Sequence, residues 1–230
     1  MKIFVDSADT DEIKRYLDWG VCDGVTTNPS INLAAGVTSI EGMEQRALEI
    51  ASLIAPRPLS VEVVTDDLTE MVKQGRLYAG WADNINIKIP ITNTVGEACL
   101  PVVRTLCDDG IDVNVTAMMT FNQAMLAAKA GARFVSLFGG RIDDEGGDAT
   151  VTIRRTREWL DRWGDDCPNS PEIIVGSTRT RGNISDWAAT GAHVLTVTPA
   201  ILGQMVTNAR TKETVTQFLA DAEQALSSME

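Results

Sequence analysis

A single lysine interrupts an isoleucine-rich run, NINIKIP at residues 84–90, that otherwise has the composition of a buried strand. Burying an ammonium group is costly unless it is paired or gives up its proton. A lysine that loses the solvation of its ammonium has more free amine available to attack a carbonyl group. Lys88 is therefore the first candidate for chemistry, as a nucleophile that forms a Schiff base.

Side-chain alternation predicts where this lysine points. Successive side chains of a strand face opposite sides, so Lys88 shares one face with the asparagines of the run, and the isoleucines share the other. Pro90 cannot donate to a sheet ladder and marks the end of the strand. The same alternation places Asp6 and Glu62 on the inner faces of their own strands. One amine and two carboxylates are thus expected to converge.

Other strands end in polar residues on the same face. Taken singly, each has a structural explanation: Asp6 could cap the following helix, Glu62 could only pair with Lys88, and the arginines could be solvated. A purely structural barrel would fill these positions with aliphatic residues. We therefore predict one polar cavity that also contains Thr26, Asn28, Asn114, Thr116, Ser136, Phe138, Ser177 and Arg179.

Eight short β-branched runs alternate with segments of helical apolar spacing. This order favours a parallel sheet, and eight units favour a (β/α)8 barrel, in which the chemistry lies at the carboxyl ends of the strands. The fold class is therefore α/β, a single (β/α)8 TIM barrel with an extra C-terminal helix, forming one domain over residues 1–230. The extra helix, about 212–226, is expected to pack on a neighbouring subunit. The predicted strands are 3–6, 24–28, 59–63, 84–89, 111–116, 133–138, 172–177 and 193–198.

Composition narrows the function classes. A net charge of −12 disfavours nucleic acid and anionic membranes as partners. The one histidine, His193, starts a strand at the end away from the catalytic rim and is expected to be structural. Four cysteines without metal-ligand spacing indicate free thiols in a reducing compartment. The N-terminus turns acidic too early for a signal peptide. We expect a cytoplasmic enzyme that uses no metal and no cofactor.

The segments VTTNPS, NIKIP, VNVT, FNQAMLAAKAG, SLFGGRIDD and GSTRT, in this order, resemble the transaldolase family, specifically the small-subunit branch that includes fructose 6-phosphate aldolase. The resemblance implies that Lys88 forms the Schiff base and that Asp6 takes the proton of the C4 hydroxyl. It also implies an acid and base role for Glu62, which we expect to act through a bound water, because a direct bridge would hold the ammonium charged. Thr116 is implied as a fourth catalytic residue, near the lysine and water. The implied substrate-binding residues are Thr26, Asn28 and Asn114 for hydroxyls, Ser136 and Phe138 beside them, and Arg141, Ser177 and Arg179 for a terminal phosphate.

Two positions separate branches of the family. Transaldolases carry Glu and Phe where fructose 6-phosphate aldolases carry Gln and Tyr, and this chain has Glu62 and Phe138. The leading function is transfer of a dihydroxyacetone unit from a ketose phosphate to an aldose phosphate. Alternatives are an aldolase that releases dihydroxyacetone, a sulfosugar transaldolase and a non-catalytic sugar-phosphate-binding barrel. The resemblance also implies a homo-oligomer, with a decamer built from pentamers as one candidate assembly. Departures from the familiar pattern are Gly139-Gly140 before Arg141 and Thr178 between Ser177 and Arg179.

Overall fold

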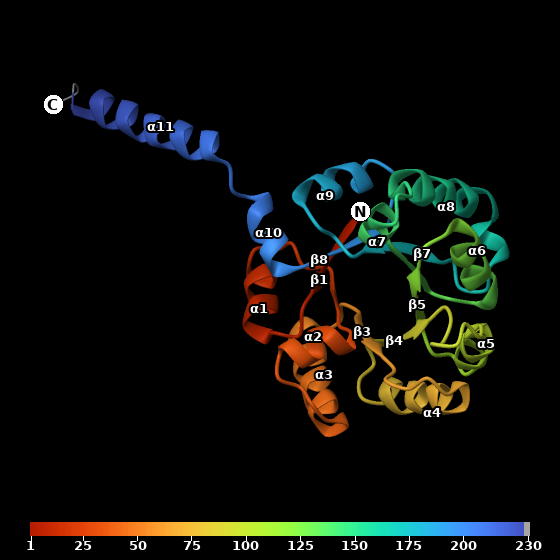
Figure 1. The fold of residues 1–230 in the computed structure, drawn as a ribbon. Helices are drawn as coiled ribbons and strands as arrows, with labels where there is room; N and C mark the ends of the chain where they lie inside the picture. Colours follow the sequence, from red (N-terminus) through yellow and green to blue (C-terminus); the bar gives the residue numbers. More distant parts are fainter. Residues whose placement is uncertain (228–230) are drawn as a thin grey trace.

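Eight parallel strands close into a barrel in this computed structural model, which describes residues 1–227 (Figure 1). Each strand pairs with the next in the chain, and the last pairs with the first. Helices cover the outside of the barrel, so the predicted (β/α)8 fold is confirmed. The strands are β1 Lys2–Asp6, β2 Gly24–Thr26, β3 Leu59–Glu62, β4 Ile85–Pro90, β5 Val113–Met118, β6 Phe134–Phe138, β7 Glu172–Gly176 and β8 Val194–Val197.

The helices include two short ones that the apolar spacing did not predict. These are α2 and α7, which directly follow β2 and β6 and therefore lie at the mouth of the barrel. The Asn28 side chain caps α2, and Pro29 stands in its first turn, where its missing N–H costs nothing. The helices are α1 Thr10–Asp18, α2 Pro29–Ala34, α3 Ile40–Ile54, α4 Leu68–Ala79, α5 Leu100–Asp108, α6 Phe121–Ala130, α7 Gly139–Asp144, α8 Ala149–Trp163, the 3-10 helix η1 Gly164–Asp166, α9 Arg181–Ala188, α10 Pro199–Met205 and α11 Ala209–Ser227.

The extra C-terminal helix, α11, begins three residues before the predicted position. Its start is explained by Asn208, whose Oδ1 accepts hydrogen bonds from the backbone N–H groups of Arg210 and Thr211. The helix projects away from the barrel at the C-terminal end of the described chain (Figure 1). None of its residues is buried within the single chain.

The strands of the barrel carry two layers of side chains, one on the outer face and one on the inner face, and the two differ in chemistry. Outward-facing aliphatic residues of the strands pack against the helices and form the main core. Inside the barrel, a small separate cluster of Phe4, Phe134, Ile174 and Val194 closes the end where the strands begin. The inner wall above this cluster is polar, because Thr26, Ser60 and Asn114 and their neighbours are buried there. The polar residues therefore lie between this apolar cluster and the carboxyl ends of the strands.

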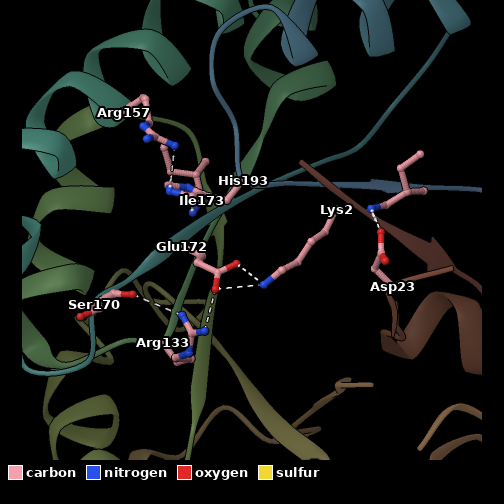
Figure 2. Close-up of polar contacts among 9 residues, drawn as sticks. Lys2, Asp23, Arg133, Arg157, Ser170, Glu172, Ile173 and His193 are labelled. Atoms are coloured by element: carbon pink, nitrogen blue, oxygen red, sulfur yellow. Dashed lines mark hydrogen bonds and ion pairs between the residues drawn. The ribbon is translucent and has the colours of Figure 1, made fainter. Parts of the chain in front are cut away.

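Charged groups link the beginnings of several strands to one another (Figure 2). The Glu172 carboxylate accepts hydrogen bonds from Lys2 and Arg133 and joins β1, β6 and β7. His193 accepts a hydrogen bond at Nδ1 from the backbone N–H of Ile173, and Arg157 lies 3.0 Å from its Nε2. The only histidine is thus a structural link at the closed end of the barrel.

Two further observations concern the cysteines and the helices of the described chain. The four cysteines are free, as their spacing indicated. Among residues 1–227 no helix combines the length and the apolar character needed to cross a bilayer.

Candidate active site

Lys88 lies on the inner face of β4 and is only 5% exposed. Its Nζ donates a 2.8 Å hydrogen bond to the backbone carbonyl of Thr27 and lies 3.0 Å from Glu62 Oε2. The expectation that a water separates Lys88 from Glu62 was wrong. The two residues are register partners on the adjacent strands β3 and β4, so they project inward at the same height and meet directly.

The second carboxylate, Asp6, ends β1 beside the end of β2. Strand register pairs it with Thr26, whose hydroxyl donates a 2.6 Å hydrogen bond to Asp6 Oδ1. Asp6 does not cap the following helix, because Asp9 does so. Burial raises the pKa of Asp6, and the Glu62 carboxylate adds to this, whereas Lys88 and the Thr26 hydroxyl lower it. The net direction of the Asp6 pKa is upward, because the cost of burying the charged form outweighs the two favourable contacts.

One cavity of about 140 Å³ opens at the carboxyl ends of the strands. It is lined by every residue predicted for the site except Glu62, which contacts the lysine beside it. Three lining residues, Ile174, Gly176 and Thr196, were not predicted from the sequence, although they alternate with outward-facing aliphatic residues on β7 and β8. The lining residues are Asp6, Thr26, Asn28, Lys88, Asn114, Thr116, Ser136, Phe138, Arg141, Ile174, Gly176, Ser177, Arg179 and Thr196.

A chain of hydrogen bonds crosses the barrel interior. Ser136 Oγ donates to Asn114 Oδ1 at 2.6 Å, and Asn114 Nδ2 donates to Ser60 Oγ at 3.1 Å. Ser60 Oγ donates in turn to Asn86 Oδ1 at 2.6 Å. Ser60 and Asn86 were not predicted as site residues, yet each stands two positions before Glu62 or Lys88 on the same face. This chain fixes the Asn114 side chain, because both ends of its amide are held.

Two predicted binders keep polar atoms available to a ligand. Asn28 Oδ1 accepts the backbone N–H of Ile31 as a helix cap, which leaves the amide N–H groups of Asn28 for other partners. The buried Thr116 Oγ1 has no hydrogen-bond partner within residues 1–227. A buried hydroxyl of this kind normally finds a partner, and here it lines the cavity.

The far end of the cavity carries positive charge. Arg141 lies in the short helix α7, and its guanidinium stacks over the Phe138 ring, with Cζ 5.5 Å from the ring centroid. Arg179 Nη2 lies 2.7 Å from Asp144 Oδ2, and both side chains are about half exposed. Ser177 has a φ of +62°, in the left-handed region, which turns the chain sharply at the end of β7. Arginine offers a planar set of donors that matches an oxyanion.

The glycine pair before Arg141 has a steric reason. A Cβ at Gly140 would overlap the carbonyl oxygen of Ser177, and a Cβ at Gly139 would lie 2.6 Å from Cζ2 of the buried Trp187. Gly140 thus lets α7 approach the end of β7 closely. This contact places the residue before Arg141 against the backbone of Ser177. Arg181, by contrast, is outside the cavity and donates to the carbonyl of Thr207.

Comparison with known proteins agrees with this arrangement. A family model described as Transaldolase/Fructose-6-phosphate aldolase matches residues 3–230. The chain belongs to the transaldolase/fructose-6-phosphate aldolase family. It is 42% identical to a probable transaldolase of Ruegeria sp. (strain TM1040), with 98% of each chain covered. It is 38% identical to probable transaldolase 2 of Listeria monocytogenes, with 97% of this chain and 96% of the relative covered.

More distant solved structures share the barrel of this transaldolase-family chain. One is a thiamine phosphate pyrophosphorylase from Pyrococcus furiosus, with a TM-score of 0.60, 12% identity, and 88% of this chain and 87% of that chain covered. Another is a putative phosphonomutase from Burkholderia cenocepacia J2315, with a TM-score of 0.57, 14% identity, and 95% and 92% covered. At such low identity the similarity concerns the fold alone. Within residues 1–227, no group of three or more His, Cys, Asp or Glu is placed to hold a metal ion.

Proposed function

We propose that this protein is a class I transaldolase that moves a dihydroxyacetone unit from a ketose phosphate, such as fructose 6-phosphate or sedoheptulose 7-phosphate, to an aldose phosphate. The observation that carries the proposal is the buried Lys88, held 3.0 Å from Glu62 Oε2 in a polar cavity that Asp6 also lines. The Glu62 and Phe138 pair favours transfer over simple aldol cleavage. No resident cofactor enters the reaction.

The first step is formation of the Schiff base. Glu62 accepts a proton directly from the Lys88 ammonium, and the free amine attacks the keto carbon of the sugar. A proton of the attacking nitrogen moves to the former keto oxygen, which gives the neutral carbinolamine. Glu62 then returns the proton to the carbinolamine hydroxyl, which leaves as water and gives the iminium. The Thr116 hydroxyl, which has no partner in the described part of the chain, binds this water. The direct contact replaces the water-mediated route that we expected from the sequence.

The second step breaks the C3–C4 bond. Asp6 takes the proton of the C4 hydroxyl, the C4 oxygen becomes the carbonyl of the departing aldose phosphate, and the electron pair of the broken bond moves toward the iminium nitrogen. A three-carbon enamine remains on Lys88. Attack of this enamine on a second aldose phosphate, with Asp6 returning the proton, reverses the steps and completes transfer.

The donor and acceptor pattern of the wall fits a polyhydroxylated fragment. Ser136 and Thr26 already use their hydroxyl protons on Asn114 and Asp6, so toward a sugar they can only accept. Asn28 presents its amide N–H groups as donors. A sugar hydroxyl is both donor and acceptor, and can therefore satisfy both kinds of group.

Arg141, Ser177 and Arg179 bind the terminal anion of the substrate. Guanidinium groups bind phosphate and sulfonate oxygens alike, so the phosphate is chosen because the matching family model is described as Transaldolase/Fructose-6-phosphate aldolase. Competition between a phosphorylated and a sulfonated ketose for the same turnover tests this choice. Preference for the sulfonated sugar would make the protein a sulfosugar transaldolase.

The decisive experiment is reduction with borohydride in the presence of fructose 6-phosphate, followed by mass spectrometry of the peptides. A three-carbon adduct on Lys88 is expected, and Lys88→Met should form none while keeping the fold. Binding of sugar phosphate without any adduct would indicate a non-catalytic barrel. Release of free dihydroxyacetone without an acceptor, at a rate equal to transfer, would indicate an aldolase.

We also propose a homo-oligomer in which α11 packs on a neighbouring subunit, with a decamer built from pentamers as the candidate assembly. The helix exposes Val215, Phe218, Leu219 and Leu226, each at least 50% exposed in the single chain. Such a stripe normally marks an interaction surface. Light scattering of the full chain and of a Phe218→Lys/Leu219→Lys variant tests this, since the variant should dissociate. The four free cysteines support a cytoplasmic location.

A further inference from the structure

Thr196 was not predicted as a site residue, yet its hydroxyl is linked to Asp6, the proposed general base, by hydrogen bonds through the Thr26 hydroxyl. It lies on β8 between Leu195 and Val197, whose side chains are buried in the outer core, so its own side chain points into the barrel. Thr196 Oγ1 is 2.5 Å from Thr26 Oγ1, and Thr26 Oγ1 is 2.6 Å from Asp6 Oδ1. Closure of the barrel through the β8 and β1 pairing makes this contact possible.

The direction of these hydrogen bonds follows from the number of protons. An ionised Asp6 has no proton to give, and each threonine hydroxyl has one. Thr26 must therefore donate to Asp6, and Thr196 must donate to Thr26. The Thr26 hydroxyl then has a single orientation, because it donates its proton to Asp6 and its oxygen accepts the proton of Thr196.

We propose that Thr196 is a positioning residue for bond cleavage: by donating to Thr26 it fixes the Thr26 proton on Asp6 Oδ1 and leaves Asp6 Oδ2 for the substrate hydroxyl. This inference rests on the proposed function, because it assigns Asp6 the C4 hydroxyl proton. A hydrogen bond that is polarised by a second one is also strengthened, so Thr196 stabilises the ionised form of Asp6 from a distance.

The arrangement also defines how Thr196 meets the substrate. Its only proton is directed at Thr26, and it lines the cavity, so toward a ligand it can only accept. A substrate hydroxyl beside Thr196 is therefore a donor. Since Lys88 is hydrogen-bonded to Thr27 and Glu62 instead, Thr196 has no part in Schiff-base formation. The two half-steps can be separated experimentally for this reason.

The test compares Thr196→Val, which removes the hydroxyl at nearly constant volume, with Thr196→Ser, which keeps it. A matched control is Thr156→Val, because Thr156 is also buried but donates to the Thr152 carbonyl within α8. For each protein we would measure the pH profile of kcat/KM for transfer from fructose 6-phosphate, and borohydride trapping of dihydroxyacetone on Lys88. Thermal unfolding of each variant confirms that it is folded.

Thr196→Val should lower kcat about 3- to 10-fold and move the acid limb of the profile upward by about 0.5 pH unit, as loss of one hydrogen bond in a buried chain implies. Trapping of added dihydroxyacetone on Lys88 should stay within about 2-fold of the wild type, because forming this imine breaks no C3–C4 bond and therefore needs no proton transfer to Asp6. Thr196→Ser should have the pH profile of the wild type, and so should the control variant Thr156→Val.

An unshifted acid limb in Thr196→Val would overturn the inference, and so would an equal loss in Thr196→Ser. A parallel loss of trapping would overturn it as well, because the effect would then be general damage to the site. If the wild type itself formed no adduct, the proposed function would fail first, and that result is visible before any variant is compared.

Discussion

The Lys88–Glu62 pair should be strongly coupled in stability. At 3.0 Å two unit charges attract by about 5.5 kcal/mol at an effective dielectric constant of 20 and by about 1.4 kcal/mol in water. The two side chains are 6% and 18% exposed, so the environment is closer to the first value. Desolvation opposes this attraction. We therefore expect a coupling free energy of about 2–4 kcal/mol.

The perturbations are Lys88→Met, Glu62→Gln and the double variant. Each single change leaves one buried group without its partner and should lower the free energy of unfolding by about 2–3 kcal/mol. The double variant removes both charges of the pair and should lower it by about 2 kcal/mol, because neither member of the pair is left as an unpaired charge. Urea unfolding, followed by tryptophan fluorescence at one fixed protein concentration, measures all four proteins.

A control cycle uses the Lys14–Asp18 pair on α1, which is also an ion pair but is 59% and 62% exposed. Its coupling should not exceed about 0.5 kcal/mol. If the Lys88–Glu62 cycle gave a coupling as small as this, the two groups would be solvated independently. The reasoning that burial holds the amine and its proton acceptor together would then be refuted.

Three more predictions follow from particular contacts. Gly140→Ala should raise KM for phosphorylated ketoses at least about 10-fold, because the new Cβ would overlap the Ser177 carbonyl. An unchanged KM would show that the contact between α7 and the end of β7 does not affect substrate binding. Burial and the Arg157 guanidinium lower the pKa of His193. The unfolded chain then binds more protons, so stability should fall as the pH drops below about 6.5, less steeply in His193→Gln; equal slopes would exclude this linkage. Burial raises the pKa of Cys107 to about 11, so Ellman's reagent should modify it slowly at about pH 8. Modification of Cys107 faster than that of a free thiol would contradict its burial.

The sequence determined which side chains enter the barrel. Period-two alternation in a strand is local, so Lys88 and Glu62 could be assigned to the inner face from their apolar neighbours alone. The eight-fold repetition of strand and helix patterns likewise predicted the fold. The short helix α7 was missed because six residues beginning with two glycines carry no apolar periodicity.

Only the tertiary structure decided which inner residues touch. Glu62 meets Lys88 without an intervening water because strand register sets them level, and Thr196 reaches Thr26, 170 positions away, because the last strand closes on the first. Arg179 meets Asp144, and Ser177 turns sharply, because α7 packs against the end of β7. Local patterns fix the direction of a side chain within its own strand, whereas its height and neighbours depend on register and closure, which involve residues far apart in the chain.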